Sequence, residues 1–125
     1  MINVCLLGYG NWGRTVLKSL NQIKIIKKIT VIKNRKDKSK IPYNTDWAFV
    51  TVSTVNHFLV VKNLLNKGIN VFCEKPLTNY IKNDLELYKI AKQKKCKLYV
   101  SDLENYKKIK IYPKNENFIT RKKYS

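Results

Sequence analysis

The stretch VCLLGYGNWG, residues 4–13, decides the fold, because an apolar run leads directly into a G-x-G-x-x-G motif. The apolar run is typical of a buried parallel strand, and residues 11–22 follow with apolar side chains at helical spacing. In such a unit Gly8 permits the tight turn, Gly10 leaves room for a pyrophosphate, and Gly13 lets the helix pack closely on the sheet. Free N–H groups and the dipole at the helix start favour the phosphates. We therefore predict a dinucleotide-binding loop, and a glycine-rich turn without a ligand is the alternative.

Strands and helices alternate beyond this loop. Apolar and β-branched runs predict four further strands, at 29–32, 48–52, 70–73 and 97–100. Apolar residues at helical spacing predict two further helices, at 57–67 and 80–95. This order predicts an α/β fold, a Rossmann-like doubly wound parallel sheet with helices on both faces.

The predicted domain organisation follows from where this alternation stops. We predict a single Rossmann dinucleotide-binding domain over residues 1–100 and a C-terminal extension over residues 101–125. Within the extension, residues 108–112 alternate like a strand and residues 118–124 end in a basic stretch. We expect the extension to be an edge strand of this sheet or the remnant of a second domain.

Size and composition fit one globular domain. The chain has 125 residues, of which 44% are apolar and 27% charged, so it can bury a core. No apolar run approaches the roughly 20 residues of a membrane span, and residues 1–7 lack the basic start of a signal peptide. We expect a soluble cytoplasmic domain. The cysteines have neither metal-ligand nor redox spacing, so we expect buried thiols and no metal site at Cys5, Cys73 and Cys96.

The net charge of +18 comes from 26 Lys and Arg against 8 Asp and Glu. A charge of this size suits a polyanion partner, since Lys and Arg neutralise phosphates. Nearly all the basic residues are Lys, however, and they are spread over the chain together with abundant Asn, Ile and Tyr. The chain also lacks the glycine and aromatic motifs that RNA-binding sheets carry. We therefore do not expect a dedicated nucleic-acid surface.

The end of the second predicted strand bears on the choice of cofactor. An NAD site usually places Asp or Glu there, about 20 residues past the glycine loop, to bind the ribose hydroxyls. This chain has IKNRK at residues 32–36 instead, with Asn34 and Arg35 in its centre. A basic cluster suits a 2′-phosphate, so NADP is favoured over NAD, although Lys is frequent everywhere in the chain.

Two further loops follow strands whose carboxyl ends share an edge with the glycine loop. After the third strand, Ser53 and Thr54 offer hydroxyls to a ribose or phosphate, and Asn56 is placed to cap the next helix. His57, the only histidine, is more simply a first-turn helix residue packing on the loop than a catalytic histidine. After the fourth strand comes EKPL at 74–77, in which the proline constrains the residue before it. Its charged pair faces a ligand or is simply solvated, and both interpretations stay open.

Three stretches occur in a particular order: VCLLGYGNWG at 4–13, DWAFVTVSTVNH at 46–57 and GINVFCEKPL at 68–77. Together they resemble the Gfo/Idh/MocA family of NAD(P)-dependent oxidoreductases, over about residues 2–100. The Glu-Lys-Pro-Leu after the fourth strand is the most specific of the three. Trp12 inside the glycine loop looks like the branch of the family that acts on sugars and nucleotide sugars.

The resemblance implies roles for individual residues. The glycine loop would line the pyrophosphate, the loop after the third strand would border the nicotinamide-side ribose and phosphate, and Glu74 would sit beside the nicotinamide. Lys75 would be the catalytic residue, hydrogen-bonding cofactor or substrate and supporting hydride transfer. The cofactor-binding residues expected from the chain as a whole are Gly8, Gly10, Asn11, Trp12, Gly13, Asn34, Arg35, Ser53, Thr54, Asn56, His57, Glu74, Lys75 and Pro76.

The resemblance also implies what a complete enzyme would need. Full-length members continue into a larger α/β domain that supplies most substrate contacts and an acid/base group, commonly a histidine. This chain has no second histidine. We therefore expect an NAD(P)-binding domain like the N-terminal half of a sugar or nucleotide-sugar dehydrogenase, incomplete as an enzyme unless a homo-oligomer or a partner chain completes it. A small oxidoreductase that uses Lys75 on a CH–OH group of a sugar-like substrate is one alternative. A non-enzymatic nucleotide- or polyanion-binding regulatory protein is the other.

Overall fold

The computed structural model describes residues 1–34 and 40–101. Five strands and three α-helices alternate along this part of the chain, with one short 3-10 helix between the third strand and the second α-helix. In chain order they are β1 (Ile2–Leu7), α1 (Asn11–Leu20), β2 (Ile26–Ile32), β3 (Trp47–Val50), η1 (Thr54–Asn56), α2 (His57–Asn66), β4 (Asn70–Glu74), α3 (Ile81–Lys94) and β5 (Leu98–Ser101).

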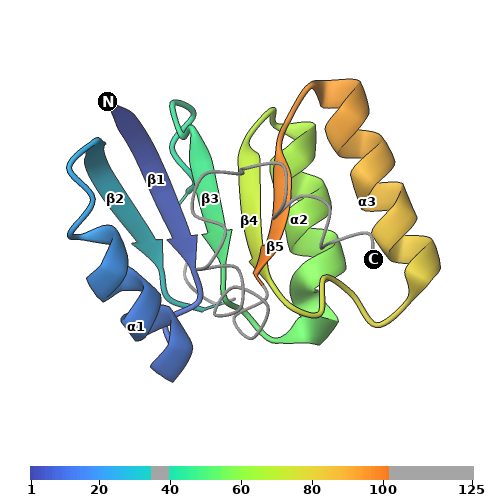
Figure 1. Ribbon diagram of the computed structural model, residues 1–125, viewed down its shortest axis with the longest axis horizontal. Helices are drawn as coiled ribbons and strands as arrows, with labels where there is room; N and C mark the ends of the chain where they lie inside the picture. Colours follow the sequence, from blue (N-terminus) through green and yellow to red (C-terminus); the bar gives the residue numbers. More distant parts are fainter. Residues whose placement is uncertain (35–39, 102–125) are drawn as a thin grey trace, which may run out of the picture.

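The strands form one parallel sheet in the order β2-β1-β3-β4-β5 (Figure 1). The chain runs from β1 outward to β2, returns across β1, and then runs outward again through β3, β4 and β5. The predicted Rossmann-like doubly wound fold is therefore confirmed. In this class of sheet the strand order reverses at one place, here between β1 and β3, and ligands bind outside the carboxyl ends of the strands at that place.

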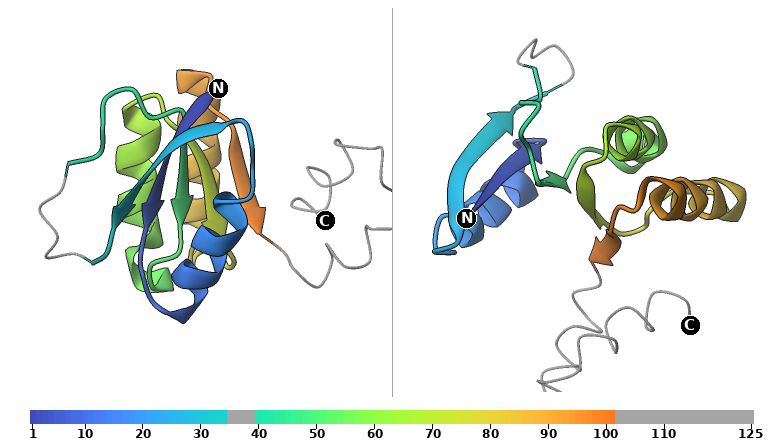
Figure 2. Two further views of the ribbon diagram at one scale, coloured as in Figure 1. Left: turned by 90° about the vertical axis from the view of Figure 1, so that its left-hand side faces the viewer. Right: turned by 90° about the horizontal axis from the view of Figure 1, so that it is seen from above.

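Helices cover both faces of the sheet, as the alternating pattern predicts. Figure 2 shows α1 on one face and α2 with α3 on the other. In the part of the chain that the structure describes, none of the helices is both long and apolar enough to cross a membrane.

The main core lies between the sheet and the pair α2 and α3. Alternate strand residues point into it, so that Ala48 and Val50 of β3 are buried there together with their β4 neighbours. From the helices, Leu64 and Leu87 are fully buried against them. Burying a side chain of this size stabilises a fold by about 1.5–3 kcal/mol, so this face supplies most of the apolar stabilisation.

The opposite face of β3, β4 and β5 carries half-buried aromatic side chains. Phe49 and Phe72 are paired neighbours in the sheet and stack with ring centroids 5.3 Å apart. Trp47 and Tyr99, on β3 and β5, stack across β4 with centroids 5.8 Å apart. Such stacked pairs add to the stability that burial alone gives, and they tie the central strand to the edge strand.

The structure moves some predicted boundaries. β2 begins at Ile26 rather than residue 29, because Ile26 pairs with Ile2 at the start of β1 even though two exposed lysines follow it. β3 ends at Val50 rather than residue 52, because its partner there is Leu7, the last residue of β1. The predicted strand at 108–112, the basic stretch at 118–124 and all of the extension beyond Ser101 lie outside the described residues.

Candidate functional site

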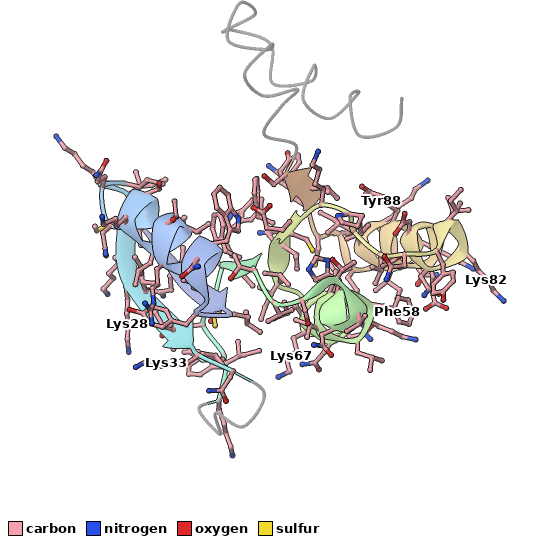
Figure 3. All side chains as sticks on the ribbon, turned by 90° about the horizontal axis from the view of Figure 1, so that it is seen from below. Lys28, Lys33, Phe58, Lys67, Lys82 and Tyr88 are labelled. Carbon is pink, nitrogen blue, oxygen red and sulfur yellow. The ribbon has the colours of Figure 1, made fainter. Side chains whose placement is uncertain are left out.

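Three loops meet at the edge of the sheet toward which all strands point. They are the glycine loop after β1, the loop of residues 51–57 after β3, and the loop of residues 75–80 after β4. The backbone N–H of Thr51 donates to the Leu7 carbonyl at 2.8 Å, which continues the β1–β3 ladder into the loops. Figure 3 looks onto this edge and shows Lys33 beside the end of β2. The three loops therefore follow neighbouring strands at the edge that includes the β1–β3 reversal.

Gly8 and Gly13 make the glycine loop compact. Gly8 has a φ of +104°, and a Cβ there would lie 2.7 Å from the Thr51 hydroxyl oxygen. A Cβ on Gly13 would lie 2.5 Å from the Gly8 carbonyl oxygen. The start of α1 can approach the end of β1 this closely only because both side chains are absent. The packing role predicted for Gly13 is thus visible in the structure.

Thr51 joins the glycine loop to β3, although it is not among the site residues predicted from the sequence. Its hydroxyl oxygen lies 3.0 Å from the Leu7 carbonyl oxygen and 3.2 Å from that of Gly8, and it can donate to either. The sequence feature that could have indicated this role is the position of Thr51 directly after β3, the strand that pairs with β1.

Gly10 differs from its two neighbours in the motif. Its φ of −79° and ψ of −165° are available to any residue, and a Cβ there would meet no atom within 4 Å. Protein packing therefore does not explain a glycine here, whereas a phosphate group approaching the backbone would. Gly10 is also the N-cap of α1, and Asn11 and Trp12 are exposed in its first turn. This open cradle at a helix N-terminus fits a pyrophosphate.

A cationic cluster lies beside the glycine loop. The Arg14 guanidinium carbon is 5.1 Å from the centroid of the Tyr9 ring, and the Lys33 ammonium nitrogen is 5.4 Å from it. Both distances are within the range of cation–π attraction. From the sequence, Asn34 and Arg35 are the residues expected at this part of the site. Asn34 is exposed directly after Lys33, and Arg35 lies outside the described residues.

The loop after β3 presents polar groups at the edge. Ser53 is exposed and Thr54 is half-buried at the start of η1. Asn56 occupies the N-cap position of α2, but its side chain makes no capping hydrogen bond. Its amide nitrogen instead donates to the Ser53 hydroxyl oxygen at 2.9 Å. The expected capping role of the Asn56 side chain is therefore wrong, because this partner within the loop takes its place.

The loop after β4 is exposed at its start and buried at its end. Glu74 is half-buried, Lys75 and Pro76 are exposed, and the peptide bond between Lys75 and Pro76 is cis. Leu77 and Thr78 are buried. The Thr78 hydroxyl oxygen accepts from the backbone N–H of Tyr80 at 3.1 Å and lies 2.5 Å from an Asp84 carboxylate oxygen, so the end of this loop is fixed to the start of α3.

His57 is buried, with 1% of its surface exposed. One ring nitrogen, Nε2, lies 2.9 Å from the Val52 carbonyl oxygen. The other, Nδ1, lies 2.9 Å and 3.0 Å from the carbonyl oxygens of Pro76 and Leu77. His57 is thus a first-turn helix residue that packs on the loops. Because the ring is buried, it can affect a ligand at this edge only by positioning those loops.

The cysteine thiols are poorly suited to chemistry at this edge. Burial raises the pKa of Cys5 to about 11 and raises the pKa of Cys73 further, with smaller contributions from the Glu74 and Asp84 carboxylates. Burial also raises the pKa of Cys96. A thiol whose pKa is raised stays protonated at neutral pH and is a poor nucleophile or metal ligand. In the described ranges, no three His, Cys, Asp or Glu side chains come together as a metal site would require.

Comparison with known proteins identifies a family. The family model Gfo/Idh/MocA, described as "Oxidoreductase family, NAD-binding Rossmann fold", matches residues 24–102. This match begins after the glycine loop and includes the loops after β3 and β4. A Salmonella typhimurium protein named "Putative oxidoreductase YceM" is 42% identical over 55 residues, which are 44% of this chain and 18% of that protein.

Solved structures share the fold at low sequence identity. Biliverdin reductase from Synechocystis, solved with biliverdin and NADP+, has a TM-score of 0.73 and 15% identity over 82% of this chain and 38% of its own. A Sinorhizobium meliloti protein named "putative myo-inositol dehydrogenase" has a TM-score of 0.69 and 18% identity over 81% of this chain and 36% of its own. The chain therefore spans well under half of the length of these proteins.

The glycine geometry predicts different effects for two alanine substitutions. Gly13→Ala should lower the free energy of unfolding by about 1–3 kcal/mol, because its Cβ would press on the Gly8 backbone. Gly10→Ala should change it by less than about 1 kcal/mol, because its Cβ has open space. Urea unfolding followed by circular dichroism measures both. Equal destabilisation by the two substitutions would contradict this geometry.

Proposed function

Because the chain belongs to the Gfo/Idh/MocA oxidoreductase family, we propose that it binds a nicotinamide dinucleotide across the carboxyl ends of β1, β3 and β4. One observation carries the proposal. The glycine loop, the loop after β3 and the loop after β4 follow neighbouring strands at one edge of the sheet, which includes the reversal of strand order, and the centre of the glycine loop is open. The two loops outside the glycine motif lie within the region that matches the family model.

Each loop has its own part of the dinucleotide to hold. The backbone at Gly10 and the first turn of α1 bind the pyrophosphate. Ser53 and Thr54 offer hydroxyls to the ribose on the nicotinamide side, and Glu74 lies at the nicotinamide end of the site. When bound, the nicotinamide supplies a redox chemistry that protein side chains lack.

We assign the catalytic role to Lys75. Its side chain is exposed at the edge of the sheet, directly after the end of β4. The ammonium group holds a proton at Nζ and donates a hydrogen bond to the oxygen on the reacting carbon of the substrate. The contact of Thr78 with Asp84 fixes the far end of the loop after β4, and this holds the backbone that carries Lys75.

The residues that follow β2 favour NADP over NAD. The 2′-phosphate of NADP lies at the end of the second strand of such a domain, where NAD sites usually carry an acidic residue. Here the described residues after β2 are Lys33 and Asn34, and Arg14 and Lys33 both lie within cation–π distance of the Tyr9 ring. Two cations held beside one ring are placed to bind an added phosphate.

The substrate we propose is a sugar-like molecule with a reacting CH–OH group. Trp12 at the exposed start of α1 supports it, and so does the name of the inositol dehydrogenase among the fold relatives.

The activity needs substrate contacts and an acid/base group beyond this domain, since the chain has one histidine and it is buried. We propose that further protein, from a partner chain or a second copy, completes the site. Binding of nucleotides or polyanions without catalysis is the alternative, because the charge of +18 attracts any phosphate.

Titration with NADPH separates a built site from general attraction to charge. We expect saturable binding at both low and high salt, followed by fluorescence of the dihydronicotinamide. Gly10→Val should weaken it by at least about tenfold, because a branched side chain fills the pyrophosphate cradle. Binding that disappears with salt and is insensitive to Gly10→Val would instead support the polyanion alternative.

The cofactor preference depends on the cation pair beside Tyr9. The double substitution Arg14→Ala with Lys33→Ala should raise the Kd for NADPH about 10- to 100-fold and that for NADH less than about twofold, since only NADPH carries the 2′-phosphate. The matched control is Lys28→Ala, which removes an exposed lysine from β2 itself. Parallel loss of both cofactors, or an equal effect of the control, would argue against a 2′-phosphate site.

The catalytic assignment is tested with a panel of sugars and polyols and both oxidised cofactors. Where turnover is found, Lys75→Ala should reduce kcat by at least about 100-fold while the Kd for NADPH changes less than about threefold. Lys82→Ala, an exposed lysine on α3, serves as the control. Unchanged turnover in Lys75→Ala would exclude this role.

A further inference from the structure

The single histidine of the chain sits between the two loops that flank the nicotinamide end of the proposed site. His57 begins α2, and its ring separates Val52, at the start of one loop, from Pro76 and Leu77 in the other. Each ring nitrogen lies within 2.9–3.0 Å of backbone carbonyl oxygens. One side chain therefore contacts the backbone of both loops at hydrogen-bond distance.

The ring can bind either loop through an N–H. A carbonyl oxygen only accepts hydrogen bonds, so a ring nitrogen that carries a proton donates to the carbonyl it faces. A proton on Nδ1 is donated to the Pro76 or Leu77 carbonyl, and a proton on Nε2 is donated to the Val52 carbonyl. In both cases the ring fills the space between the two loops.

The thiol of Cys73 on β4 is a further partner of the ring. Its sulfur lies 3.4 Å from Nδ1, and because burial raises the pKa of this thiol, it keeps its proton and can donate to that nitrogen. With the ring proton on Nε2, the ring donates to the Val52 carbonyl and accepts from Cys73. The end of β4 therefore also holds the ring in place.

We propose that His57 is a positioning residue, a clamp that joins the loop after β3 to the loop after β4 and so sets the geometry of the nicotinamide end of the site. The clamp holds the Pro76 carbonyl, one residue from Lys75, and the Val52 carbonyl, next to Ser53. His57 itself is too buried to touch a ligand. Its effect on binding rests on the proposed function, whereas its contact with the two loops is a property of the protein alone.

The clamp is tested first without any ligand. Because the chain has one histidine, the side-chain nitrogen spectrum from ¹⁵N NMR contains a single imidazole. We expect a ring N–H whose proton exchanges slowly with water, because the ring is buried and donates to a backbone carbonyl. A ring N–H that exchanges as fast as that of a free imidazole would overturn the clamp, whatever the protein binds.

The second test separates positioning from folding. His57→Phe keeps a ring of similar size but no donors, and His57→Gln keeps a donor for one loop. We expect His57→Phe to raise the Kd for NADPH about tenfold and His57→Gln to restore part of that loss. Adenosine 2′,5′-bisphosphate, which has only the adenine half, should bind both variants within about twofold of the unchanged protein. Asn63→Ala, at an exposed position of α2, is the control.

The possible results keep the two proposals apart. If the unchanged protein binds neither probe, the proposed function fails and the nitrogen spectrum alone decides the clamp. If it binds both and His57→Phe binds NADPH as tightly, the positioning role is wrong while the proposed function stands. If His57→Phe loses both probes equally, the ring serves folding rather than the nicotinamide end, and the positioning role is again wrong.

Discussion

The pairing of β1 with β3 is the constraint on which the rest of the site depends. It brings Leu7 beside Val50, so that the next residue on each strand, Gly8 and Thr51, meets the other at the edge of the sheet. The Thr51 N–H and hydroxyl bind backbone carbonyls at the end of β1, and these contacts leave no space for a Cβ on Gly8. Gly13 then packs on the Gly8 carbonyl. One strand pairing thus sets the position of the helix start that faces a ligand.

The third loop is connected to this arrangement through a different kind of contact. The β4 strand places the Lys75 loop at the same edge, but strand pairing ends at Glu74. Beyond that point the His57 ring and the contact of Thr78 with Asp84 hold the loop. The exposed lysine and proline are therefore carried between two buried anchors. This explains how a short surface loop can present a defined side chain to a ligand.

The sequence predicts the fold well because its signals are local. Apolar runs, helical spacing and the G-x-G-x-x-G motif each lie within a short window, and they predict the α/β alternation and the edge at which the loops meet. The less accurate boundaries depend on distant partners: β2 extends to Ile26 because Ile2 pairs with it, and β3 stops at Val50 because its partner strand β1 ends at Leu7. No local pattern contains these pairings.

The same limit applies to the site. Motifs suggest the roles proposed for the glycines, Ser53 and Lys75, whereas the contacts of Thr51 and His57 join residues 44 and 19–20 positions apart. The cation pair beside Tyr9 joins a residue of α1 to one that follows β2. For Asn56 the sequence predicts a contact that is not made. Its position suggests that the side chain caps α2, but the side chain donates to Ser53 instead. Side-chain partners of this kind are set only when the elements pack.

Mapping the NADPH-induced changes in backbone amide resonances tests most directly whether the three loops form one dinucleotide site. We expect saturable shifts grouped in residues 8–14, 51–57 and 74–78, with the amides of α3 beyond its first turn unchanged, at both low and high salt. Shifts scattered over the lysine-rich surface that vanish as salt is added would contradict a single site, because they would mean that charge alone attracts the ligand.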